Sequence, residues 1–184
     1  MKKINAIDLD DTLLKTNSFK EYYLMFLFKS NFKIFLCLSF FGLLRKLNVI
    51  NKSVFFVNLV YCCRKYKNYN IKILKLTENV LLKINQEVFT LIKNNIDENT
   101  ICVICTNSPS DYVVNIAKYF NWEYLASELN NKTNEFIFMD GENKKKYLLN
   151  KYPKENYLYN FAVSDSSDDD VMLDLFSKSI KIEK

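Results

Sequence analysis

The spacing of hydrophobic and polar positions divides the chain into a short apolar start, a long helical stretch and a region of alternating elements. Residues 3–9 have the pattern of a short buried strand, which ends at a cluster of acidic residues. Residues 18–95 carry apolar positions at helical spacing with almost no turn residues, so we expect helices only. The last of these, over 81–92, is expected to lead back into a sheet.

The remaining sequence alternates between strand and helix patterns. Strands are expected at 100–106, 123–127, 157–165 and 179–183, and helices at 113–120, 144–151 and 171–177. Ser110 and Asp111 are expected to cap the first of these helices, and residues 134–141 fit either a hairpin arm or a loop. The alternation predicts an α/β fold with a Rossmann-like, mostly parallel sheet covered by helices on both faces, and an all-helical segment inserted after the first strand.

Polar residues gather at the carboxyl ends of three predicted strands. Asp8 and Asp10 follow the first strand, Thr106 ends the second, and Asp165 and Asp169 follow a later one. Open parallel sheets bind ligands outside the carboxyl ends of their strands, near the point where the strand order reverses. We therefore expect these three segments to meet at one rim of the sheet.

Composition narrows the chemistry that this rim can perform. The 184 residues are 49% hydrophobic and 26% charged, which indicates one globular domain, or one with a sizeable insertion. The chain has no His, which excludes catalytic schemes based on imidazole and His-ligated zinc. The net charge of +5 is spread over scattered lysines, which favours a solvated surface over a nucleic-acid site.

The cysteines and one apolar segment bear on location. Cys102 and Cys105 lie three apart on a predicted strand and so face opposite sides of the sheet. We expect the five cysteines to be buried free thiols in a cytoplasmic protein. Residues 22–44 are strongly apolar, but Lys29 and Lys33 leave a run shorter than the roughly 18–20 residues that a bilayer span needs. The segment therefore predicts one or two buried or interfacial helices, which leaves peripheral contact with a membrane open.

Four short motifs follow one another along the predicted core. In this order they resemble the four motifs of the haloacid dehalogenase-like (HAD) superfamily, most of whose members are phosphatases, and the third has the G-x-x-K-x-x-x-L form of phosphoserine-phosphatase-like members. The motifs are DLDDT (8–12), VICTNS (103–108), DGENKKKYLL (140–149) and VSDSSDDDVML (163–173). The resemblance implies a catalytic core of residues 1–13 and 88–184, and a helical cap of residues 14–87.

The resemblance also implies a mechanism, that of a Mg²⁺-dependent phosphatase acting through an aspartyl-phosphate intermediate. It implies that Asp8 is the nucleophile. A carboxylate can attack phosphorus directly, and Asp10, two residues later in an extended segment, projects to the same side. Asp10 can then protonate the leaving oxygen and afterwards activate water.

The other site residues are assigned by the same resemblance. Thr106, Asn107 and Lys144 are expected to bind the phosphate, with Thr106 and Lys144 also assisting catalysis. Mg²⁺ is expected to be held by Asp8, the Asp10 carbonyl and Asp165, while Asp169 either orients Lys144 or binds a metal-bound water.

Neighbouring residues have plainer interpretations. Asp11 is expected to be a solvent-facing loop acid, and Asp168 and Asp170 to be acids at a helix start. The resemblance leaves a second interpretation for Asp168, which stands where members of that family often carry an Asn on the phosphate side. Lys145 and Lys146 compete with Lys144, which the spacing from Gly141 favours. Ser164 stands where relatives often have Gly.

Two alternative functions remain open at this point. One is a phosphomutase or phosphotransferase of the same fold, and the other is a non-catalytic module that binds a membrane or a partner. A dehalogenase of the same fold is disfavoured, because such enzymes normally lack the second acid and Asp10 is present.

The expected partner is a small phosphorylated substrate and not a nucleic acid. The apolar residues from Phe19 to Tyr69 form a core, or else a face for a substrate with an apolar or lipid-linked part, a membrane surface or a second subunit.

Overall fold

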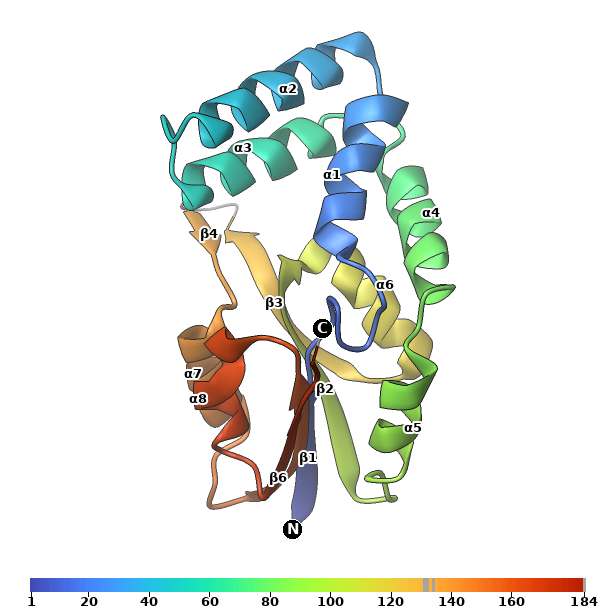
Figure 1. Cartoon of the computed structure of the whole chain (residues 1–184), viewed down its shortest axis with the longest axis vertical. Coiled ribbons are helices and arrows are strands. Elements are labelled where there is room, and N and C mark those ends of the chain that lie inside the picture. The colour runs from blue at the N-terminus through green and yellow to red at the C-terminus, as the bar shows by residue number, and fades with distance from the viewer. Residues whose placement is uncertain (131–132, 134, 184) are drawn as a thin grey trace.

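The computed structural model describes residues 1–130, 133 and 135–183. A six-stranded sheet of order β4-β3-β2-β1-β5-β6 stands at its centre (Figure 1). Neighbouring strands are parallel except for the antiparallel pair β3 and β4. The strands are β1 (Lys2–Ile7), β2 (Thr100–Pro109), β3 (Glu123–Asn130), β4 (Glu135–Ile137), β5 (Tyr157–Ser164) and β6 (Lys178–Lys181). This arrangement confirms the expected α/β class and mostly parallel sheet.

Helices cover both faces of the sheet and extend beyond one end of it. Figure 1 shows α5 and α6 on one side and α7 and α8 on the other, with α1–α4 beyond the carboxyl ends of the strands. The helices are α1 (Ser18–Lys29), α2 (Phe32–Lys46), α3 (Lys52–Arg64), α4 (Tyr69–Leu81), α5 (Gln86–Lys93), α6 (Ser110–Phe120), α7 (Gly141–Lys151) and α8 (Asp170–Leu173), with a 3₁₀ turn at Ser167–Asp169. We refer to α1–α4 as the helical insertion.

Asparagine and aspartate side chains fix the starts of several helices. The side-chain oxygens of Asn17, Asn31 and Asn51 accept backbone N–H groups in the first turns of α1, α2 and α3. Asp140 does the same for α7, where it accepts from the backbone N–H of Asn143. Such side chains satisfy N–H groups that the helix itself leaves without a partner.

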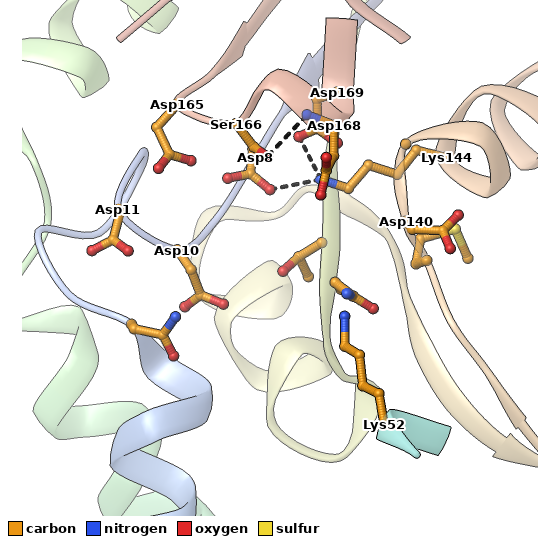
Figure 2. A pocket seen from close by; sticks show the side chains of 15 residues that line it. Asp8, Asp10, Asp11, Lys52, Asp140, Lys144, Asp165, Ser166, Asp168 and Asp169 are labelled. Atoms are coloured by element: carbon orange, nitrogen blue, oxygen red, sulfur yellow. Dashed lines mark hydrogen bonds and ion pairs between the residues drawn. The ribbon is translucent and has the colours of Figure 1, made fainter. Parts of the chain in front are cut away.

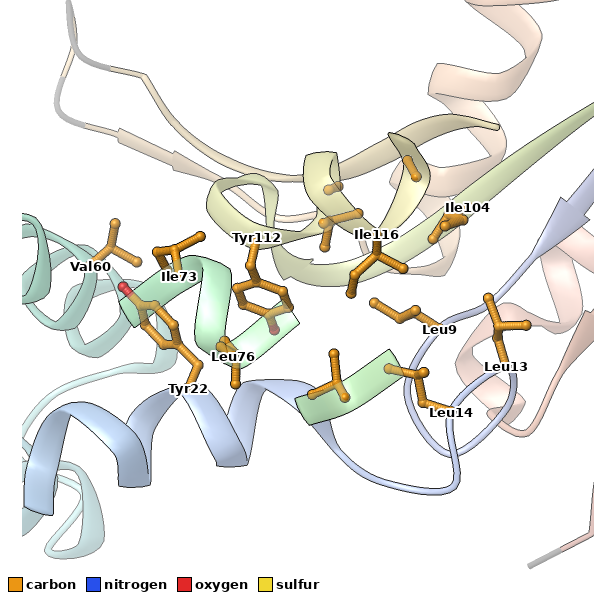
Figure 3. Close-up of a cluster of buried hydrophobic side chains, with 14 of the residues drawn as sticks. Leu9, Leu13, Leu14, Tyr22, Val60, Ile73, Leu76, Ile104, Tyr112 and Ile116 are labelled. Carbon is orange, nitrogen blue, oxygen red and sulfur yellow. The ribbon is translucent and has the colours of Figure 1, made fainter. Parts of the chain in front are cut away.

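The sheet separates two apolar cores. The smaller lies under α7 and α8, where Leu148 and Met172 pack against Ile4 and Val103. The larger lies under α5 and α6 and continues into the insertion (Figure 3). Buried side chains shared between sheet, first loop and insertion form it, among them Leu9, Leu13, Leu14, Tyr22, Val60, Ile73, Leu76, Ile104, Tyr112 and Ile116. The insertion is therefore packed onto the sheet layer through a continuous core.

Four local details differ from, or decide between, the expectations. Strand β2 runs to Pro109 and not to residue 106, because its pairing with β3 continues past an irregularity between Thr106 and Pro109. Ser110 begins α6 instead of capping it. Helix α8 ends at Leu173, short of the expected residue 177. Residues 135–137 form a hairpin arm, while residue 134 of that segment lies outside the described residues.

The expectation that all five cysteines are free is wrong. Cys37 of α2 and Cys62 of α3 form a disulfide, because these neighbouring helices bring the two side chains together. The other three, Cys63, Cys102 and Cys105, are buried and free. Within the described ranges, none of the helices combines the length and the apolarity that crossing a bilayer requires.

Candidate active site

A cavity of about 240 Å³ opens at the carboxyl ends of β1, β2 and β5. Strand order reverses at β1, because β2 and β3 lie on one side of it and β5 and β6 on the other. The cavity therefore sits where open parallel sheets bind ligands. Its lining residues are Asp8, Asp10, Asp11, Asn17, Lys52, Thr106, Asn107, Met139, Asp140, Gly141, Lys144, Asp165, Ser166, Asp168 and Asp169 (Figure 2). Every site residue expected from the sequence is among them.

Asp8 lies directly after β1 with its carboxylate buried. Its Oδ1 accepts a hydrogen bond from Lys144 Nζ at 2.8 Å, and its Oδ2 accepts one from Thr12 Oγ1 at 3.0 Å. Burial raises the pKa of Asp8 to about 6, although the ammonium of Lys144 acts in the opposite direction. The carboxylate is thus held in a fixed orientation by two donors.

Lys144 lies on the first turns of α7 and points between two carboxylates (Figure 2). Its Nζ is 2.8 Å from Asp8 Oδ1 and 2.6 Å from Asp169 Oδ2. Burial would lower its pKa, but the two carboxylates outweigh burial and raise it, so the ammonium stays charged. Of the three consecutive lysines, Lys144 is the buried one, whereas Lys145 and Lys146 do not line the cavity.

Asp169 accepts a second hydrogen bond that fixes its position. Ser164 Oγ donates to the same Oδ2 atom at 2.6 Å. Of the two roles considered for Asp169, its contacts match the orientation of Lys144. Ser164 thus contributes a hydroxyl to this arrangement.

Asp10 is oriented by donors from two other segments. Its Oδ1 accepts from the backbone N–H of Ser18 at 2.6 Å, and its Oδ2 accepts from Ser108 Oγ at 2.5 Å. Burial raises the pKa of Asp10, while these two hydrogen bonds act to lower it. Asp11, the next residue, has φ = 58°, a left-handed conformation that Asp adopts more readily than most residues.

Thr106 and Asn107 line the cavity from β2, where the pairing of β2 with β3 becomes irregular after Thr106. Thr106 Oγ1 accepts the backbone N–H of Ser108 at 3.1 Å. Because this bond uses a lone pair, the hydroxyl hydrogen of Thr106 can be donated to a ligand. The side-chain oxygen of Asn107 accepts from Ser127 Oγ at 2.9 Å, which holds the amide against β3.

The oxygen groups around Asp8 fit a magnesium ion. Thr12 Oγ1 lies 3.0 Å from Asp8 Oδ2 and 3.2 Å from Asp165 Oδ1, so these carboxylates converge on one hydroxyl. The described residues that line the cavity include seven Asp and two Lys. A bound cation would offset this excess of negative charge. Among the described residues no cluster of three metal-binding side chains is found. Magnesium commonly uses one or two carboxylates and fills its octahedron with other oxygens, so two acids are sufficient.

Several residues at the site carried no expectation from the sequence. Thr12 belongs to the first motif but had no assigned role, and Ser108 lies in a stretch that reads as a turn. Ser18 uses its backbone N–H, which no sequence pattern reveals. Asn17 and Lys52 reach the cavity from the insertion, where only the tertiary fold brings them to the rim.

The fold is similar to that of several solved structures, although the sequence matches no protein-family model and no curated protein. A protein of unknown function from Bordetella pertussis Tohama I aligns with a TM-score of 0.72 and 13% identity, over 98% of this chain and 90% of that one.

Two further neighbours have descriptions that name an activity or a family. A probable phosphoserine phosphatase from Vibrio cholerae aligns with a TM-score of 0.66 and 11% identity, over 97% of this chain and 56% of that one. A HAD family hydrolase from Salmonella enterica serovar Typhi aligns at 0.57 and 12% identity, over 95% of this chain and 60% of that one. At these identities the likeness concerns the fold alone. The chain therefore has the fold of the haloacid dehalogenase-like hydrolases, as its four motifs led us to expect.

Proposed function

We propose that the protein is a Mg²⁺-dependent phosphatase that hydrolyses phosphomonoesters through an aspartyl-phosphate on Asp8. The observation that carries the proposal is the position of Lys144, whose ammonium lies between the carboxylates of Asp8 and Asp169 at the cavity floor. Burying such charges costs several kcal/mol per ion unless they are closely paired. A site built at this cost is better explained by chemistry on a phosphate than by a structural role.

In the first step, Asp8 attacks phosphorus and the bond to the leaving oxygen breaks. Asp10, whose pKa is raised by burial, donates its proton to that oxygen, so an alcohol leaves. Lys144 and the hydroxyl of Thr106 supply positive charge and a hydrogen bond to the phosphoryl oxygens. The phosphoryl group then resides on the carboxylate of Asp8.

In the second step, water hydrolyses the aspartyl-phosphate. Asp10 is now a carboxylate and takes a proton from the attacking water, while the bond between phosphorus and the Asp8 oxygen breaks. Inorganic phosphate leaves and both aspartates return to their starting states. The hydrogen bonds from Ser18 and Ser108 keep Asp10 in one orientation for both proton transfers.

Asp8, Asp165 and the backbone carbonyl of Asp10 are the groups that would hold Mg²⁺. When bound, the ion offsets the repulsion between the aspartates and the phosphate dianion. The need for a cation follows from the charge of the lining. Among the described residues that line the cavity, two lysines do not neutralise seven aspartates.

The lining also bears on the substrate. Met139 is the one apolar side chain among the described residues that line the cavity, so we propose a small substrate that is polar next to its phosphate. Lys52 and Asn17 enter from the insertion and suit an anionic or hydroxyl group beyond the phosphate. The apolar surface of the insertion lies outside this cavity.

A phosphatase screen of the whole chain tests the proposal. A panel of amino-acid, sugar and nucleotide monophosphates is assayed for released phosphate, with Mg²⁺ and with excess chelator. We expect Mg²⁺-dependent release from at least one polar substrate. Turnover that persists in chelator, or transfer of the phosphoryl group to a second substrate position without release, would contradict the proposal, and the latter would favour a mutase.

A further inference from the structure

Helix α2 presents a row of large apolar side chains that the described part of the chain leaves exposed. At 100° per residue the five positions fall within one face of the helix. The residues are Phe32, Leu36, Phe40, Leu43 and Leu47 at the helix end, whose exposed fractions are 71, 51, 57, 54 and 63%. We call this row the α2 stripe. Figure 1 shows α2 at the end of the molecule opposite the N-terminus.

The opposite side of α2 is apolar as well. Ile34 and Leu38 point the other way and are buried in the larger core, where α2 packs on α1 and α3. A helix that is apolar on both sides normally has both sides covered. Contiguous exposed apolar surface of this kind marks an interaction site.

The charge of the insertion indicates what covers the stripe. Residues 22–77 contain ten Lys and Arg and no Asp or Glu, whereas the rest of the chain contains 16 Lys and Arg against 21 Asp and Glu. Lys33 and Lys46 are exposed at the two ends of α2 and flank the stripe on either side. The apolar row is therefore flanked by lysines, in a segment that carries basic but no acidic side chains over 22–77.

We propose that the α2 stripe docks on the surface of a bilayer that contains anionic lipids. Apolar residues flanked by Lys and Arg on a surface helix bind the interface by burial among the acyl chains and by attraction to anionic headgroups. With 15 residues α2 is roughly 22 Å long, shorter than the roughly 30 Å hydrocarbon core, so it lies on the membrane and does not cross it.

A second copy of the chain is the competing occupant of the stripe. Such a dimer would bring two insertions together, each with ten basic and no acidic residues over 22–77. Like charges brought together in such an interface repel, whereas an anionic membrane neutralises them. Charge complementarity therefore favours the lipid surface.

Vesicle flotation of the full chain tests the proposal without reference to catalysis. Vesicles of phosphatidylcholine alone are compared with vesicles that contain about one-third phosphatidylglycerol. The test variant carries Leu36→Glu with Phe40→Glu. The matched control carries Leu158→Glu with Tyr119→Glu. These two apolar side chains lie on β5 and α6, outside the insertion, and are similarly exposed, at 50 and 64%. A second variant reverses the flanking charges by Lys33→Glu with Lys46→Glu, and thermal melting confirms that each variant is folded.

We expect the wild type and the Leu158/Tyr119 control to float with the anionic vesicles, and added salt to weaken the binding. The Leu36/Phe40 and Lys33/Lys46 variants should each bind at least roughly tenfold more weakly. Absence of wild-type flotation, or equal flotation of the Leu36/Phe40 variant, would overturn the proposal. Light scattering gives a second outcome against the proposal. If the wild type does not float but forms a dimer, and the Leu36/Phe40 variant is a monomer, the stripe is a subunit interface.

Discussion

The first residue of α7, Gly141, lies against the backbone carbonyl of Asp168. A Cβ atom at position 141 would stand 1.6 Å from that carbonyl oxygen and 2.7 Å from its carbon, so no side chain fits there. The start of α7 and the turn at residues 166–169 are therefore in backbone contact. This contact places Lys144, one turn along α7, beside Asp169.

Replacing Gly141 should disturb the site through the backbone. We expect Gly141→Ala to push α7 away from the 166–169 turn, lower kcat at least roughly tenfold and cost about 1–3 kcal/mol of unfolding free energy. The matched control is Gly42→Ala, whose Cβ would meet the flexible end of Tyr23 at 2.6 Å. Steady-state kinetics and denaturant unfolding measure both variants, and equal behaviour of the two would refute this view of Gly141.

Ser108 should act through Asp10. Ser108→Ala removes a 2.5 Å hydrogen bond that stabilises the charged carboxylate, so the pKa of Asp10 rises. We expect kcat to fall roughly tenfold or more, and the limb of the pH–rate profile that reports Asp10 to move to higher pH. Ser110→Ala, in the first turn of α6, is the control. A folded Ser108→Ala enzyme with an unchanged pH profile would show that Asp10 does not depend on this bond.

Lys52 should affect substrate binding more than chemistry. It lines the cavity from α3, where its Nζ lies 5.3 Å from the ring centroid of Phe138. We expect Lys52→Glu to raise KM roughly tenfold for an anionic substrate with a smaller change in kcat. Lys65→Glu, at the other end of α3 and over the ring of Tyr61, reverses a charge away from the cavity and should leave KM unchanged. Equal effects of the two variants would point to the overall charge of the insertion and not to a contact.

The metal requirement should be selective. We expect chelation to remove activity, Mg²⁺ to restore it and Ca²⁺ to inhibit. Ca²⁺ is larger and takes more oxygen ligands, so it can bind both oxygens of Asp8 and prevent the attack on phosphorus. Assays with each ion after exhaustive chelation measure this, and equal rates with Mg²⁺ and Ca²⁺ would contradict it.

Much of the fold and the meeting of distant residues could be predicted because they follow from repeating patterns. Alternating strands and helices give a parallel sheet, whose strands all end at one rim, so Asp8 and Asp165 were expected together. The same reasoning predicted that Thr106, at the end of the neighbouring strand pattern, would lie at this rim. Lys144 could be preferred over its neighbours because its spacing from Gly141 matched a known motif.

The rest depends on packing that sequence patterns do not encode. Ser108 reaches Asp10 because β2 continues past Thr106, where Asn107 and Pro109 read as a turn. Lys52 reaches the cavity only through the way in which α3 packs on β4 and the larger core. The disulfide of Cys37 and Cys62 depends on how two helices pack side by side, which their separation in sequence does not reveal.

Substitution of the nucleophile tests the central claim most directly. Asp8→Asn keeps the size of the side chain but cannot form the aspartyl-phosphate. The measurement is turnover of an aryl phosphate with Mg²⁺ by wild type and Asp8→Asn, with circular dichroism to show that both are folded. We predict steady turnover by the wild type and loss of at least about 10³-fold in the variant. Wild-type turnover by a folded Asp8→Asn protein would contradict the account.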